Sequence, residues 1–255
     1  MFELVPILVA IGFGAGTLGS LIGVGGGIVI VPALTFLGLQ PTQIASTSLF
    51  AVASTSSSSS LEYARQKRID YRLAISMACA AIPGAVLGAF LSPYFTLELF
   101  KLLFAMLLAS IGIYVIYKRT ILRETEFKNG LAAKSVVLAS SFGAGIISSL
   151  FGVGGGVIFV PVMLLVLGIV MQRAAPTSQL VLMMTSVAGV ITHSALGHPD
   201  YLYAVCLSIG ALAGGYFGAK ISPKLQDSKL QSILGLVLFG VSAKLLYDWM
   251  SSLKT

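Results

Sequence analysis

Charged side chains are scarce in this sequence, and their scarcity excludes a soluble globular protein. Asp, Glu, Lys and Arg make up 10% of the 255 residues, whereas 56% are hydrophobic. Soluble domains carry about 25% charged residues, so this chain cannot cover a water-facing surface. Its apolar runs of about 20 residues have the length of helices that span a bilayer. The sequence therefore predicts an all-α membrane protein.

Acidic side chains are missing from the interior of the apolar runs. All nine Asp and Glu residues lie at the ends of the runs or between them. Cation carriers and proton pumps commonly keep carboxylates inside the membrane, so this distribution argues against a cation as the substrate. The 16 Lys and Arg residues lie mostly in short connections, where they set orientation. The net charge of +7 therefore does not indicate a nucleic-acid partner.

Cysteine and histidine are too few to build a metal or catalytic centre. Cys79 and Cys206 lie far apart in apolar runs, without a CxxC spacing. His193 lies deep in such a run, where a hydrogen-bonded structural role is the plainer interpretation and a proton relay the alternative. An intramembrane enzyme would need a nucleophile–base pair or a metal cluster. We therefore expect no enzymatic activity, no metal and no cofactor.

What the sequence does contain is one segment written twice. Residues 13–32 read FGAGTLGSLIGVGGGIVIVP and residues 142–161 read FGAGIISSLFGVGGGVIFVP, with 13 of 20 positions identical. Each copy centres on Gly-Val-Gly-Gly-Gly, and four glycines in five residues break a helix. Broken helices in two corresponding halves indicate the binding site of a transporter. The structural alternative is that the glycines only let helices pack closely.

The duplication covers nearly the whole chain. Asp70-Tyr71 matches Asp200-Tyr201, and Ser92-Pro93 matches Ser222-Pro223, both at an offset of 130. We divide the chain into a first transmembrane repeat, a cytoplasmic linker and a second transmembrane repeat, at residues 1–117, 118–131 and 132–255. The predicted segments are 4–22, 28–38, 43–61, 71–91 and 97–117, then 132–151, 157–168, 174–196, 201–221 and 229–250.

The second segment of each repeat is too short to span. Eleven helical residues cover about 17 Å, roughly half of the hydrocarbon thickness. We interpret each as a half-helix that turns at the glycines and pairs with the preceding helix as a re-entrant hairpin. Backbone of this kind survives in a membrane only when it is buried in protein or lines a wet cavity. Each repeat then holds one hairpin and three spanning helices.

Loop charges predict that the two repeats run in opposite directions. The loop at 62–72 and the linker are rich in Lys and Arg and should be cytoplasmic, whereas residues 197–200 carry neither and should face outward. The loop at 220–229 holds three lysines and should again face inward. Equivalent loops thus lie on opposite sides. This is an inverted-topology repeat with both chain ends facing outward.

Inversion should bring the two glycine turns together near the midplane. Each turn precedes a half-helix, which we expect to start at Ile28 or Val157, with Pro32 and Pro161 in the first turns. Helix N-termini and flexible glycine backbone suit a small anion. The following helix of each repeat is rich in Ser and Thr; the run Ser56–Ser60 is expected to serve helix packing, whereas the matched Thr-Ser pairs are expected to line the site.

The predicted substrate-binding residues combine the two turns with these polar pairs. They are Gly23, Val24, Gly25, Gly26, Gly27, Thr47, Ser48, Gly152, Val153, Gly154, Gly155, Gly156, Thr177, Ser178 and Gln179. Arg173, just after the second half-helix, is interpreted as an interfacial cation, with attraction of an anion at the mouth as the alternative.

With two GVGGG…VP elements, each followed by a Thr-Ser helix, the chain resembles the sulfite exporter TauE/SafE family of membrane permeases over essentially its whole length. The resemblance implies a secondary carrier for small sulfur-containing anions such as sulfite, sulfonates or related organic acids. It implies site roles for the two glycine runs with Pro32 and Pro161, and less firmly for the Thr-Ser pairs. The amide of Gln179, where the first copy has Leu49, departs from the internal symmetry.

The sequence and the resemblance together predict a multi-pass protein of the cell (inner) membrane that moves a small anion by alternating access. The alternative is an anion channel on the same inverted scaffold. The expected partners are the anionic substrate and the lipid bilayer, and no nucleic acid. Proton or sodium coupling and a homo-oligomeric assembly are both compatible with this expectation.

Overall fold

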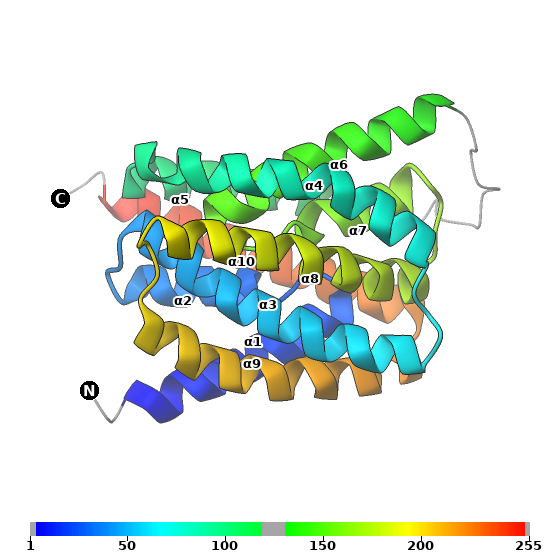
Figure 1. The fold of residues 1–255 in the computed structure, drawn as a ribbon, viewed down its shortest axis with the longest axis horizontal. Helices are drawn as coiled ribbons and strands as arrows, with labels where there is room; N and C mark the ends of the chain where they lie inside the picture. The colour runs from blue at the N-terminus through cyan, green and yellow to red at the C-terminus, as the bar shows by residue number, and fades with distance from the viewer. Residues whose placement is uncertain (1–3, 119–130, 253–255) are drawn as a thin grey trace.

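A computed structural model describes residues 4–118 and 131–252, all of them in helices or short connections (Figure 1). Most of the predicted linker, residues 119–130, lies outside the described residues. The first half contains α1 (Leu4–Ile22), α2 (Gly27–Phe36), α3 (Pro41–Arg65), α4 (Tyr71–Leu91), the 3-10 turn η1 (Ser92–Tyr94) and α5 (Leu97–Lys118). The second half contains α6 (Leu131–Phe151), α7 (Gly156–Leu165), α8 (Met171–Ala195), α9 (Tyr201–Ile221), η2 (Ser222–Lys224) and α10 (Asp227–Ser252).

Five of the described helical segments are long and apolar enough to cross a membrane. They are Leu4–Ile22, Tyr71–Tyr94, Lys134–Phe151, Met171–Ala195 and Tyr201–Lys224. Their outer faces carry large apolar side chains, such as Ile191, which is 64% exposed. Exposed apolar surface on this scale fits a lipid surround rather than water. The chain is therefore an integral, multi-pass membrane protein.

The remaining apolar helices include the two predicted half-helices. Helices α2 and α7 have 10 residues each, so each is about 15 Å long. Helix α3 is as long as α8, with 25 residues, but it carries the serine run and is not among the five apolar segments.

Helix starts follow local capping chemistry. The Asp70 carboxylate accepts a hydrogen bond from the backbone N–H of Leu73 at 3.0 Å and thereby caps α4. Asp200 caps α9 in the same way, through the N–H groups of Leu202 and Tyr203 at 3.1 and 3.2 Å. Capping of this kind stabilises a helix N-terminus by about 1 kcal/mol. The two matched Asp-Tyr pairs of the sequence are therefore helix starts.

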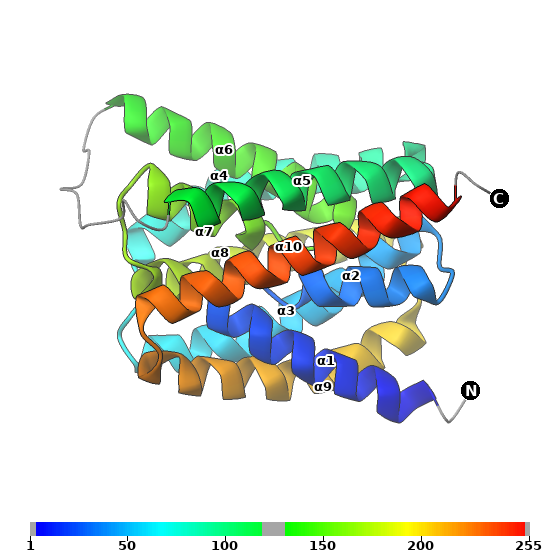
Figure 2. The ribbon, with the colours of Figure 1, turned by 180° about the vertical axis from the view of Figure 1, so that it is seen from behind.

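The two halves pack across one another rather than side by side. Helix α1 lies along α9 and α4 lies along α6 (Figure 2). Glycines make both contacts close: a methyl group placed on Gly210 would strike the Val9 carbonyl oxygen, and one placed on Gly84 would strike the Phe142 carbonyl oxygen. Small residues of this kind let membrane helices approach backbone to backbone.

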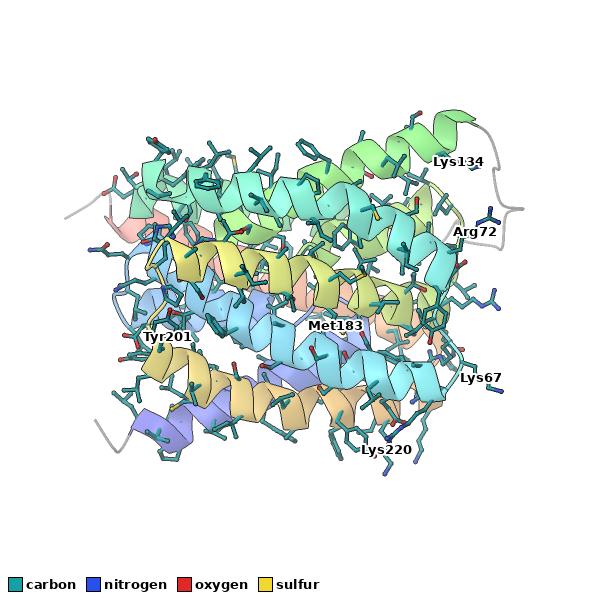
Figure 3. The ribbon with its side chains drawn as sticks, viewed as in Figure 1. Lys67, Arg72, Lys134, Met183, Tyr201 and Lys220 are labelled. Carbon is teal, nitrogen blue, oxygen red and sulfur yellow. The ribbon has the colours of Figure 1, made fainter. Side chains whose placement is uncertain are left out.

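Basic side chains gather at one end of the bundle. Lys67, Arg72, Lys134 and Lys220 lie at the end where α5 stops and α6 starts, whereas Tyr201 lies at the opposite end (Figure 3). The first and last described residues also lie at the end opposite the cations (Figure 1). The equivalent helices α4 and α9 therefore start at opposite ends. We call the cation-bearing end the linker-side end.

Candidate functional site

Both glycine runs break the chain as the sequence predicted. Helix α1 ends at Ile22 and α2 begins at Gly27, while α6 ends at Phe151 and α7 begins at Gly156. Four glycines of the two turns adopt the left-handed backbone conformation, with φ between 72° and 79°: Gly23, Gly25, Gly152 and Gly154. Residues with a Cβ avoid this region, so glycine is required at these four positions. Every residue of both turns is buried.

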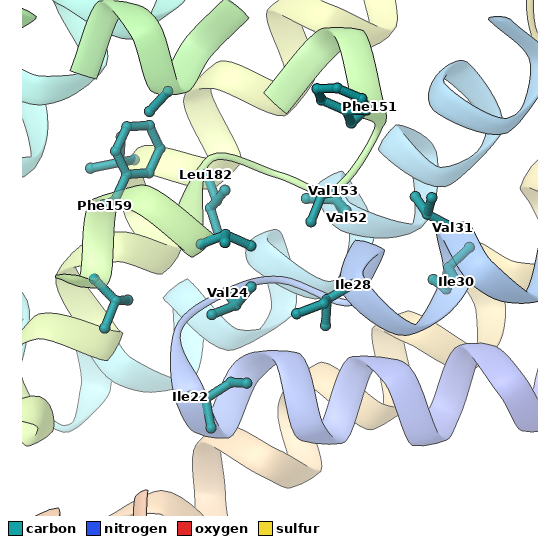
Figure 4. Packing of buried hydrophobic residues seen from close by; sticks show 14 of the residues in the cluster. Ile22, Val24, Ile28, Ile30, Val31, Val52, Phe151, Val153, Phe159 and Leu182 are labelled. Atoms are coloured by element: carbon teal, nitrogen blue, oxygen red, sulfur yellow. The ribbon is translucent and has the colours of Figure 1, made fainter. Parts of the chain in front are cut away.

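The two turns lie against each other in the centre of the molecule (Figure 4). A methyl group placed on Gly27 would lie 2.5 Å from the carbonyl oxygen of Val153. One placed on Gly156 would lie 2.5 Å from the carbonyl oxygen of Gly23. The structure therefore brings the ten predicted turn residues into a single cluster, although the two runs of five lie 129 residues apart in the sequence.

Each turn presents an uncapped helix N-terminus. Gly26 and Gly155 occupy the N-cap positions of α2 and α7 and supply no side-chain hydrogen bond, and neither helix has an acidic residue in its first turn. The first N–H groups of a helix have no partner inside it and carry about half a positive charge. Two such N-termini, close together and without carboxylates, form an arrangement suited to an anion.

The prolines lie deeper in the half-helices than predicted. Pro32 is the sixth residue of α2 and Pro161 the sixth of α7, so both lie inside these helices rather than in their first turns. The expectation was wrong because α2 and α7 begin one residue earlier than predicted, at Gly27 and Gly156, which places each proline in the second helical turn. A proline inside a helix removes one hydrogen bond to the carbonyl four residues earlier. Those carbonyls belong to Ile28 and Val157, next to the turns.

The first turn is held by four polar side chains. Ser178 donates to the Gly23 carbonyl at 2.7 Å, and the Gln179 amide donates to the Gly19 carbonyl at 2.8 Å. Ser59 donates to the Gln179 side-chain oxygen at 3.1 Å, and Tyr63 donates to the Ser20 carbonyl at 2.8 Å. Buried carbonyls at a helix end require such partners. Two of the predicted residues, Ser178 and Gln179, therefore lie at the turn and fix it.

The second turn is held differently. At the second turn His193 takes the place of Tyr63: its Nε2 lies 3.0 Å from the Ser149 carbonyl oxygen. Ser48 and Leu49 stand at the positions equivalent to Ser178 and Gln179. The buried Ser48 hydroxyl has no hydrogen-bond partner among the described residues. The two turns are thus alike in backbone and unlike in the side chains around them.

The predicted threonines anchor loops. Thr47 Oγ1 accepts a hydrogen bond from the backbone N–H of Asp200 at 3.1 Å, and Thr177 Oγ1 accepts one from that of Asp70 at 3.1 Å. Thr177 also donates to the Arg173 carbonyl at 2.7 Å. Each hydroxyl is therefore committed to fixing the start of α9 or α4.

Sequence reasoning missed Thr55, which lies in the serine-rich part of α3. Its buried hydroxyl finds no partner in the described part of the chain, and a methyl group placed on Gly26 would lie 3.3 Å from its Oγ1. Ser148 and Ser149, at the end of α6, also have buried side-chain hydroxyls that lack partners within the described ranges. A run of serines gives no sign of which hydroxyl faces a turn, so only the fold identifies Thr55.

Two apolar side chains close over both turns. Methyl groups placed on Gly25 and Gly154 would lie 3.1 Å and 3.0 Å from the Val52 side chain, and 3.4 Å and 3.0 Å from that of Leu182. Val52 and Leu182 occupy equivalent positions of α3 and α8 and are fully buried. Through these contacts with Gly25 and Gly154 they pack against both turns, in the cluster around them (Figure 4).

These features define a class of protein: a multi-pass membrane protein with a buried polar centre built from two glycine turns. The family model "Sulfite exporter TauE/SafE" matches residues 8–245. The chain therefore belongs to the TauE/SafE family of membrane transporters.

Relatives match over almost their whole length. The probable membrane transporter protein YunE of Bacillus subtilis (strain 168) is 33% identical over 95% of this chain and 97% of its own. The probable membrane transporter protein MJ0441 of Methanocaldococcus jannaschii is 29% identical over 92% of each chain. YdhB, another probable membrane transporter protein of Bacillus subtilis, is 27% identical over 90% of this chain and 95% of its own. No solved structure matches the chain.

Proposed function

We propose that this protein is a secondary transporter of a small oxyanion and works by alternating access in the cell (inner) membrane. The observation that carries the proposal is the contact between two buried glycine turns, each opening onto a helix N-terminus without a side-chain cap or a carboxylate in its first turn. Such N-termini attract anions and repel cations. The glycines let a ligand approach the backbone closely.

Unpartnered hydroxyls complete the proposed site. Ser48 and Thr55 can each donate a hydrogen bond to an oxyanion, and without a ligand each is a buried polar group that has no partner among residues 4–118 and 131–252. The family description names sulfite. We therefore take a sulfur-containing oxyanion or an organosulfonate as the substrate, bound between the turns.

The proposed mechanism needs two inverted repeats. In support, α4 and α9 start at opposite ends of the bundle, and α2 and α7 are half the length of a span. We interpret α1–α2 and α6–α7 as re-entrant hairpins whose turns meet at the midplane. Rocking of one half against the other would then open the site to one side at a time. The linker-side end faces the cytoplasm in this scheme because it gathers Lys and Arg.

We take the described conformation, in which Val52 and Leu182 pack against both turns, as a closed state of the carrier. A carrier passes through such a closed state in every cycle, whereas an open channel requires a continuous wet path.

The proposal includes coupling of transport to protons or sodium ions. A gradient of either ion across the liposome membrane tests this coupling.

The test is transport by purified protein in liposomes. External radiolabelled sulfite is offered to liposomes loaded with sulfite, sulfate, thiosulfate, taurine, sulfoacetate or a carboxylate analogue. A carrier takes up labelled sulfite faster when the internal anion is also a substrate, because exchange of one anion for another needs no net movement of charge. Uptake that is independent of the internal anion would instead support the channel. Absence of sulfite uptake with every internal anion would refute sulfite as the substrate, and absence of uptake when each of the other anions is labelled in turn would refute the oxyanion assignment.

Thr55→Val tests the site itself. The loss of a hydrogen bond to a charged ligand is worth about 1.5–3 kcal/mol, so transport should fall about ten- to a hundredfold. Ser56→Ala is the matched control, because the Ser56 hydroxyl bonds to the Val52 carbonyl of its own helix at 2.7 Å. Equal transport by wild type and Thr55→Val would remove Thr55 from the site.

A further inference from the structure

A cationic pocket lies at the linker-side end, outside the glycine turns. It has a volume of about 250 Å³ and is lined by Lys67, Arg68, Ile69, Asp70, Tyr71 and Arg173. Its residues come from the α3–α4 loop, from the first residue of α4 and from the first turn of α8. Three cations therefore face one carboxylate, and that carboxylate already caps α4. The pocket has a net positive charge and walls that both halves of the chain contribute.

One of the three cations is held in place by the fold. Arg68 Nε donates to the Gln172 carbonyl at 3.1 Å, and its Nη1 lies 3.2 Å from the Gln66 side-chain oxygen. The guanidinium also lies 5.5 Å from the centre of the Tyr63 ring. Lys67 and Arg173 are exposed at the same pocket. The arrangement combines a fixed charge with two adaptable ones, as in sites that recognise oxyanions.

The internal duplication provides a reference for this pocket. The residues equivalent to Lys67, Arg68 and Arg173 in the other repeat, at the offset of 130, are Gly197, His198 and Gln43. Asp70 and Tyr71, by contrast, are matched by Asp200 and Tyr201. The repeat therefore needs the Asp-Tyr helix start at both places but the three cations at only one. A cytoplasmic location accounts for basic residues at this end in general, as for Arg72 and Lys220; what distinguishes Lys67, Arg68 and Arg173 is that all three line one cavity.

Lys67 also adopts an unfavourable backbone conformation. It is the one non-glycine residue with positive φ in the described part of the chain, at 55°, and its equivalent Gly197 has φ 73°. Glycine would fit this position without strain. A lysine here places an extra cation at the pocket in spite of that strain.

We propose that this pocket binds an oxyanion at the membrane surface, either a free anion of the size of sulfate or the phosphate of an anionic lipid headgroup. The proposal does not rest on the transport function, because it concerns a site with its own residues. On α8, Ala175 contacts the first turn, since a methyl group placed on Gly23 would lie 2.5 Å from its Cα. Arg173 lies two residues nearer the helix start. Arg173 and Ala175 belong to the same turn of α8, so this turn contributes both to the pocket and to the contact with the first glycine turn.

The test uses substitutions that the other repeat already carries. In Lys67→Gly/Arg173→Gln, each pocket residue becomes its own equivalent, so the fold should tolerate both changes. Arg72→Gln is the control, because it removes a cation from the same end of the bundle outside the pocket. Sulfate binding to the purified full chain in neutral detergent is measured by calorimetry at low ionic strength. Retention of phosphatidylglycerol is measured by native mass spectrometry after purification from nanodiscs of phosphatidylcholine and phosphatidylglycerol.

The expected result is weaker binding of one ligand in the double variant. Two exposed charge contacts are removed, so the double variant should lose affinity by about two- to thirtyfold. The affinity of Arg72→Gln and the melting temperature of both variants should stay near those of the wild type. A loss confined to sulfate identifies a free anion, and a loss confined to phosphatidylglycerol identifies a headgroup. The proposal is overturned if the wild type binds neither ligand, if the double variant binds both as the wild type does, or if Arg72→Gln weakens binding equally.

Discussion

The contact between the two glycine turns makes a sharp prediction for Gly27→Ala. The added methyl group would lie 2.5 Å from the Val153 carbonyl oxygen and 2.6 Å from that of Gly152. Both atoms belong to backbone, so rotation of a side chain cannot relieve the clash. Overpacking a core costs about 1–3 kcal/mol, and we expect the upper part of that range. For a chain of this size 1 kcal/mol shifts the melting temperature by about 2–4 °C.

The assay is thermal unfolding of purified protein in detergent, followed by intrinsic fluorescence. Gly27→Ala should melt about 4–12 °C below wild type, combining those two ranges for a loss of about 2–3 kcal/mol. Gly14→Ala is the matched control, since a methyl group there meets no atom of the described residues within 4 Å. Alanine is favoured over glycine in helices by about 0.8–1 kcal/mol, so this variant should melt at or above wild type.

A double variant separates contact between the turns from local strain. Gly156→Ala should destabilise the protein for the same reason as Gly27→Ala, because it presses on Gly23 and Val24. If the first methyl group already forces the turns apart, the second costs less, and the two effects are less than additive. Additive effects of the two substitutions would refute the contact between the turns, and so would a Gly27→Ala protein whose melting temperature equals that of wild type.

Two further predictions concern the histidines. His193→Phe removes the donor to the buried Ser149 carbonyl and should cost about 1–3 kcal/mol of stability. His193→Tyr, which copies Tyr63, should retain more of this stability than His193→Phe. Equal melting temperatures for wild type and His193→Phe would disprove the bond. Burial lowers the pKa of His198, in the α8–α9 loop, below its usual value of 6.5. The unfolded chain therefore binds more protons, and this contribution to stability is complete above pH 6.5 and is lost as the pH falls through the folded pKa. The melting temperature should decline between pH 7.5 and 5.5, and His198→Gln should show a smaller decline; identical pH profiles would contradict this assignment.

Much of the fold could be predicted because the strongest signals are local. A run of four glycines in five residues breaks a helix wherever it lies, and the structure breaks both helices there. Asp70 and Asp200 could be recognised as equivalent from spacing alone, and each caps a helix. Membrane insertion followed from composition. The membrane class and the half-helices therefore needed no tertiary information.

The parts that sequence reasoning could not supply depend on which way a side chain points. Thr47 and Ser48 are neighbours, yet the Thr47 hydroxyl anchors a loop and that of Ser48 has no partner among the described residues. Thr55 and Ser56 differ in the same way, since Ser56 bonds within its own helix. Adjacent residues of a helix point about 100° apart. A polar pair in the sequence therefore does not show which of its two hydroxyls is free to face a turn.

The duplication also concealed a substitution of one donor for another. Tyr63 and His193 occupy equivalent positions and bond to the equivalent carbonyls of Ser20 and Ser149. A carbonyl only accepts, so His193 Nε2 carries a hydrogen, and in the neutral ring Nδ1 is then an acceptor. The Nδ1 of His198, 2.9 Å away, must donate to it. A phenol has no equivalent of this second nitrogen. The two halves therefore hold their broken helices by bonds of similar geometry, and His193 in addition ties its helix to the α8–α9 loop through His198.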